Sequence, residues 1–114
     1  MKLQIEGQSL RVRIGEAELA QLLAGHAVES HTHLALGLSM GCALRLVAGN
    51  VAQLSGRPDA WQIELPGSAV REHAARLPTR EGLTFALPTG HGDDTLELLF
   101  DVDVRDSVRQ RRSS

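Results

Sequence analysis

The chain has 114 residues, a net charge of −2, 42% hydrophobic residues and 23% charged residues. This length fits one domain, and the composition supports a packed core, which excludes a disordered body. Aromatic residues make up only 3%, which removes the usual base-stacking platform and argues against nucleic acid as a partner.

The single cysteine, Cys42, can form no intrachain disulfide, which fits a reducing compartment. The longest stretch without charge or histidine covers residues 34–44 and is too short to span a bilayer. The first ten residues show no apolar signal-like core. We therefore expect a cytoplasmic protein with no membrane partner.

The first half of the chain predicts two hairpins around a helix. Apolar and polar residues alternate over residues 3–5 and 10–14 on either side of Gly7, as in a β-hairpin. The period changes to that of a short amphipathic helix over about residues 16–24. Alternation then returns in strands over residues 28–36 and 43–48, with a predicted turn over residues 37–41 between them.

The second half repeats this order. We expect strands over residues 51–54 and 61–65, a helix over 67–77 that Pro78 ends, and strands over 83–87 and 96–100. The halves match at an offset of about 51 residues, which indicates an internal duplication of a ββαββ unit. Neither unit buries its apolar faces well alone, so two units in one chain form a single core.

These patterns predict an α+β fold with a mainly antiparallel sheet, about eight strands and two helices, and a pseudo-two-fold axis. Residues 1–104 form one domain made of units 1–49 and 50–104, and residues 105–114 form a basic tail. One sheet, two packed sheets and a barrel all remain open as arrangements.

The opening hairpin carries the pattern Lys2-x-x-Ile5-x-Gly7-x-Ser9-x-Arg11-x-Arg13, followed by a helix that ends Leu23-Ala24-Gly25. Together with Ile63-x-Leu65-Pro66 before an Ala-rich helix, it resembles a family of small bacterial proteins of unknown function. The resemblance covers about residues 1–88 by order of elements. It implies the same fold and a bacterial cytoplasmic setting, and it transfers no activity. The arginine-rich end departs from the acidic, proline-containing end expected of that family.

Histidines give the first candidate site. His31 and His33 share one face of a predicted strand with Glu29, and His91 is one candidate for a further ligand from elsewhere in the chain. Such groups bind Zn²⁺ or another transition metal when they converge. Same-face residues lie about 6.6 Å apart along a strand, so a solvated strand face is the competing interpretation.

Two further motifs point to catalysis. His91, Asp93 and Asp94 share a glycine-rich turn, where an imidazole and carboxylates could act as acid and base. Residues 37–41 match G-x-S-x-G, the nucleophile elbow of α/β-hydrolases, which requires a strand-to-helix turn on a parallel sheet. A strand follows the motif here, so a hairpin turn between antiparallel strands is the better interpretation.

Arginines give a candidate anion site. Arg11 and Arg13 lie on one strand face, and Arg45 on a neighbouring strand could complete a basic stripe for a carboxylate or phosphate. The alternative is cross-strand pairing with Glu6 or Glu29.

Without a catalytic constellation in a suitable context, the sequence favours a non-enzymatic binding or interaction module. The alternative is a small metal-binding protein or enzyme that uses His31, His33 and the turn with His91, Asp93 and Asp94. The pattern identifies no cofactor. A homo-oligomer through an exposed strand edge is the one partner that the strand-rich plan suggests.

Overall fold

The computed structural model describes residues 1–104, which form eight strands and two helices. The predicted basic tail, 105–114, lies outside the described residues. In chain order the elements are β1 (Lys2–Glu6), β2 (Ser9–Gly15), α1 (Glu16–Leu23), β3 (Val28–Ala35), β4 (Leu38–Val47), β5 (Gln53–Arg57), β6 (Ala60–Pro66), α2 (Gly67–Ala75), β7 (Leu83–Pro88) and β8 (Thr95–Asp103).

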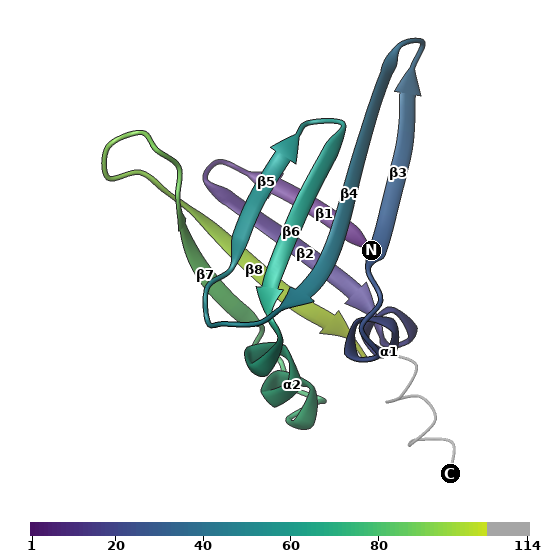
Figure 1. The fold of residues 1–114 in the computed structure, drawn as a ribbon, viewed down its shortest axis with the longest axis vertical. Coiled ribbons are helices and arrows are strands. Elements are labelled where there is room, and N and C mark those ends of the chain that lie inside the picture. The colour runs from purple at the N-terminus through teal and green to yellow at the C-terminus, as the bar shows by residue number, and fades with distance from the viewer. Residues whose placement is uncertain (105–114) are drawn as a thin grey trace.

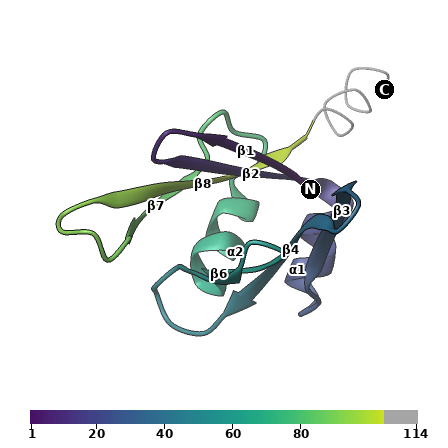
Figure 2. The ribbon, with the colours of Figure 1, turned by 90° about the horizontal axis from the view of Figure 1, so that it is seen from above.

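The strands form two four-stranded sheets that face each other (Figures 1 and 2). The first sheet has the order β1-β2-β8-β7 and the second has the order β3-β4-β6-β5. Both helices lie at the same end of the two sheets (Figure 1). Each ββαββ unit therefore gives one hairpin to each sheet, and its helix connects the two hairpins.

The central strands of each sheet run parallel, β2 beside β8 and β4 beside β6, whereas all hairpin pairs are antiparallel. Val12 on β2 lies opposite Phe100 on β8, and Ile63 on β6 lies opposite Leu44 on β4. All four side chains are fully buried. The core therefore sits between the two parallel pairs, where the pseudo-two-fold relation brings the two units together.

The helices form because each has one apolar face and a compatible start. In α1, Leu19 and Leu22 are buried, and the Glu18 carboxylate accepts a hydrogen bond of 3.0 Å from the Gly15 N–H just before the first turn. In α2, Val70 and His73 form the buried face. The helices pack against strands of both units and close that end of the core.

The predicted α+β class, with two ββαββ units, is confirmed. Several boundaries differ from expectation: β5 covers Gln53–Arg57 rather than residues 51–54, and β8 continues to Asp103. The predicted turn over residues 37–41 is wrong in extent, because β4 already begins at Leu38 and pairs with β3 from there. The second helix ends at Ala75, two residues before the expected end. Within residues 1–104, neither helix has the length and apolar character that crossing a bilayer requires.

Candidate functional site

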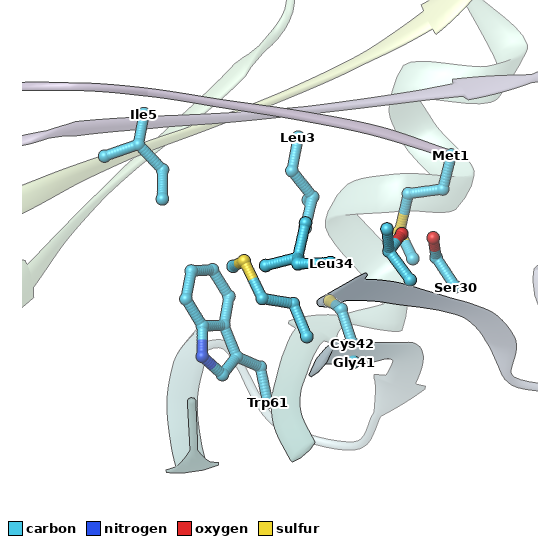
Figure 3. A pocket seen from close by; sticks show the side chains of 10 residues that line it. Met1, Leu3, Ile5, Ser30, Leu34, Gly41, Cys42 and Trp61 are labelled. Carbon is cyan, nitrogen blue, oxygen red and sulfur yellow. The ribbon is translucent and has the colours of Figure 1, made fainter. Parts of the chain in front are cut away.

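A cleft of about 390 Å³ opens between the edge of the first sheet and the β3–β4 hairpin of the second (Figure 3). Strands β1, β3, β4 and β6 supply its walls. The residues that line it are Met1, Leu3, Ile5, Ser30, Thr32, Leu34, Met40, Gly41, Cys42 and Trp61. Its volume lies within the range of about 300–1,000 Å³ that is typical of small-molecule sites.

Strand alternation explains how these side chains reach one cavity. Leu3 and Ile5 occupy every second position of β1 and point down from the first sheet toward Trp61 (Figure 3). Ser30 and Thr32 occupy alternate positions of β3 and face the same space. The cavity is therefore apolar on most sides, with two hydroxyl groups along one wall.

The lining carries little charge. Among the ten lining residues, Cys42 has the one titratable side chain, and burial raises the pKa of its thiol to about 11. The thiol therefore stays protonated at neutral pH, which removes the thiolate that nucleophilic chemistry needs. The cleft therefore suits an uncharged ligand.

The amino group of Met1 is engaged by α1. It donates hydrogen bonds of 3.0 and 2.8 Å to the two carboxylate oxygens of Glu18. Burial raises the pKa of Glu18, but the hydrogen bonds from the Met1 ammonium and the Gly15 N–H outweigh it, so the pKa lies below its usual value. This ion pair ties the start of β1 to the helix and fixes one end of the cleft.

A second cleft of about 590 Å³ lies at the pseudo-symmetric position. Its walls come from residues 51–55 at β5, from β7 and the residue after it, and from Leu96 on β8. Under the pseudo-two-fold relation β5 corresponds to β1, β7 to β3 and β8 to β4. The duplication therefore places one opening on each side of the core.

The structure brings the predicted ligands His31 and His33 together, on the opposite face of β3 from the cleft. Their rings meet edge to face with centroids 4.7 Å apart. The ring of His31 lies over Gly41, since a Cβ built at Gly41 would stand 3.1 Å from its Cδ2. Among residues 1–104, no three His, Cys, Asp or Glu side chains gather closely enough to hold a metal, so His91 does not join them.

The predicted acid–base turn is held by its own backbone. The Asp94 N–H donates to the His91 carbonyl at 3.1 Å, and the Thr89 N–H donates to the Asp94 carbonyl at 3.3 Å. The Thr89 hydroxyl donates to the same carbonyl and accepts from the His91 N–H. These bonds define a compact, exposed connection between β7 and β8.

The G-x-S-x-G motif lies in a different setting from a nucleophile elbow. Ser39 is a residue of β4, opposite His33 on β3, and the strand continues beyond it to Val47 without turning into a helix. The strand-to-helix turn that would expose a serine nucleophile is therefore missing.

The predicted arginines are divided between the two sheets. Arg11 and Arg13 on β2 both bind Asp101 on β8, with the shortest contact at 2.6 Å from Arg11 Nη2 to Asp101 Oδ2. Arg45 lies on β4 and donates to Glu64 at 2.9 Å. The three guanidinium groups do not form one stripe.

Sequence reasoning missed the cleft itself. The alternation of Leu3 and Ile5 was visible, but it does not reveal that their apolar face meets β3 and Trp61 rather than a closed core. No model of a protein family matches the chain, and no curated protein matches it significantly.

Proposed function

We propose that the protein is a non-enzymatic binding module, which holds a small, uncharged and largely apolar molecule in the cleft between β1 and β3. The observation that supports this most is the lining: apolar side chains around about 390 Å³, with the hydroxyls of Ser30 and Thr32 as the polar groups. These hydroxyls suit a single hydroxyl or carbonyl on the ligand. We also propose that the protein works in the bacterial cytoplasm. The lone cysteine and the resemblance of the opening hairpin to a family of small bacterial proteins support this setting.

Trp61 makes the proposal directly testable. It is the chain's one tryptophan, and the chain has no tyrosine, so intrinsic fluorescence excited at long wavelength reports on the cleft wall. We expect titration with 1-decanol to shift the Trp61 emission saturably. Thr32→Phe fills the cleft from β3 and should raise the Kd at least about tenfold, the effect of losing about 1.4 kcal/mol of binding.

His33→Phe is the matched control, because it adds the same ring one position along β3 but on the opposite face. It should leave the Kd unchanged. Failure of decanol to alter Trp61 emission, or equal effects of the two substitutions, would contradict binding in this cleft.

Metal binding is the second candidate function, favoured by the ring contact of 4.7 Å between His31 and His33. Two imidazoles on one strand can supply two of the ligands that zinc requires. Calorimetric titration with zinc chloride should then give binding that the double substitution His31→Ala, His33→Ala abolishes and His91→Ala preserves. Equal binding by all three proteins would exclude this pair as the site.

A further inference from the structure

Strand β3 is a long edge strand with little protection over its regular part, Val28–His33. Edge strands expose unpaired backbone groups, and proteins guard them with Lys, Pro, bulges or short length. β3 is the longest of the four edges, with eight residues, and contains no Lys, Arg or Pro. In Figure 1 no other strand of the described chain lies along its outer side. By contrast, β1 begins with Lys2, β5 ends with Arg57 and β7 ends with Pro88.

The two faces of β3 differ in chemistry. The face toward the first sheet carries Val28, Ser30, Thr32 and Leu34, and the opposite face carries Glu29, His31 and His33. The ladder with β4 is regular from Val28 to His33, and its register shifts only beyond that point. Glu29, His31 and His33 are all exposed. A regular stretch of six residues is therefore available for pairing.

Self-pairing of an antiparallel edge restricts the register. The two-fold axis must pass through a position where a residue lies opposite the same residue of the second copy. Only then do the residues whose N–H and C=O groups point away from β4 lie opposite residues of the same kind in the second copy. With the axis at His31, Glu29 lies opposite His33 of the second copy, and Ser30 lies opposite Thr32 of the second copy. Every cross-strand pair then matches in polarity, and a carboxylate faces an imidazole on both sides of the axis.

Neighbouring registers match less well. With the axis at Thr32, Glu29 would face Ala35 and Leu34 would face Ser30. With the axis at Ser30, Val28 would face Thr32, and His33 would have no residue of β3 opposite it. Complementarity therefore selects the axis at His31.

We propose that a second copy of this chain pairs antiparallel along β3, about a two-fold axis at His31. The second sheets of the two copies then form one continuous eight-stranded sheet. The unpaired N–H and C=O groups of the longest exposed edge thereby gain hydrogen-bond partners. The surface is the same on both copies, as a closed symmetric dimer requires. This inference is independent of the ligand proposed for the cleft.

Sedimentation equilibrium of the full chain, from about 1 µM to about 1 mM, tests the proposal. We expect a monomer–dimer equilibrium. Glu29→Lys and His33→Glu should each weaken the dimer about tenfold. The dimer contains two Glu29–His33 pairs, and each substitution replaces both with a repulsive or mismatched pair. The double substitution restores opposite charges across the axis and should restore the dimer.

Restoration cannot arise within one chain, because Glu29 and His33 lie about 13 Å apart along the strand. Ser55→Lys, at an exposed position on the other edge of the same sheet, is the matched control and should leave the dimer intact. Circular dichroism and the urea midpoint verify that each variant folds. A monomer throughout the range, a double variant as weak as the singles, or equal weakening by Ser55→Lys would overturn the proposal.

Discussion

Asp101 joins the two units across the first sheet through charge. Its carboxylate accepts hydrogen bonds from Arg11 at 3.0 and 2.6 Å and from Arg13 at 3.2 Å. We predict that Asp101→Ala lowers the free energy of unfolding by about 1–2 kcal/mol.

The magnitude follows from exposure. Asp101 is 15% exposed, whereas Arg11 and Arg13 keep 40% and 41% of their side-chain surface in solvent. Because the guanidinium groups can rehydrate, the loss stays below the roughly 3–5 kcal/mol that breaking a buried pair costs. Three charged hydrogen bonds on one carboxylate nevertheless exceed the contribution of about 0–1 kcal/mol of a single exposed pair.

Urea denaturation followed by far-UV circular dichroism measures this change, with the m-value expected to stay constant. Glu64→Ala is the control in the pseudo-equivalent pair, in which Glu64 corresponds to Arg13 and Arg45 to Asp101, so that the charges are reversed. One bond of 2.9 Å joins Glu64 to Arg45, which is 55% exposed. The substitution should cost about 0.5 kcal/mol. If both substitutions cost the same, or if Asp101→Ala costs more than about 4 kcal/mol, the solvent exposure of the guanidinium groups does not set the cost.

Three further predictions concern titratable groups. Burial raises the pKa of Cys42 to about 11, so iodoacetamide at pH 8 should modify the thiol at least about a hundredfold more slowly in the folded chain than in urea. Comparable rates in the two conditions would contradict the burial of Cys42. Burial, and then the charge of Arg76, lower the pKa of His73. As the pH falls, the imidazole of His73 is therefore protonated in the unfolded chain before it is protonated in the folded chain. The free energy of unfolding should therefore fall as the pH drops below about 6.5, and His73→Gln should flatten that slope in denaturant titrations at each pH. The pKa of Glu18 is raised by burial but lowered overall by its hydrogen bonds, so its stabilisation is present above the unfolded value of 4.5 and is lost as the pH falls. Glu18→Gln should reduce the thermal midpoint more at pH 6 than at pH 3, and an equal reduction at both would exclude the ion pair as the cause.

Local pattern predicted the elements well because each strand is half buried. The alternation of Leu10, Val12 and Ile14 in the sequence corresponds to three buried positions of β2, and the 3.6-residue period of Leu19 and Leu22 corresponds to the buried face of α1. The duplication was also visible, because it repeats these local periods in the same order.

Long-range pairing was less predictable. The parallel contacts of β2 with β8 and of β4 with β6 join segments far apart in the chain, and alternation carries no information about which strand lies alongside. For this reason Glu6 and Glu29 were the expected partners of the arginines, whereas Asp101 binds Arg11 and Arg13. The turn beyond Gly37 was overestimated for a related reason, since pairing with β3 extends β4 to Leu38.

The cleft depends on four strands from both units, so no local signal marks it. Its two thioethers offer the most direct test of the proposed function, because the chain has two methionines, Met1 and Met40, and both line the cleft. In a sample labelled with ¹³C at the methionine methyl groups, titration with 1-decanol should shift both signals with one common Kd, equal to that from Trp61 fluorescence. If neither methyl signal moves while other signals of the protein shift saturably with decanol, the ligand binds elsewhere and not in this cleft.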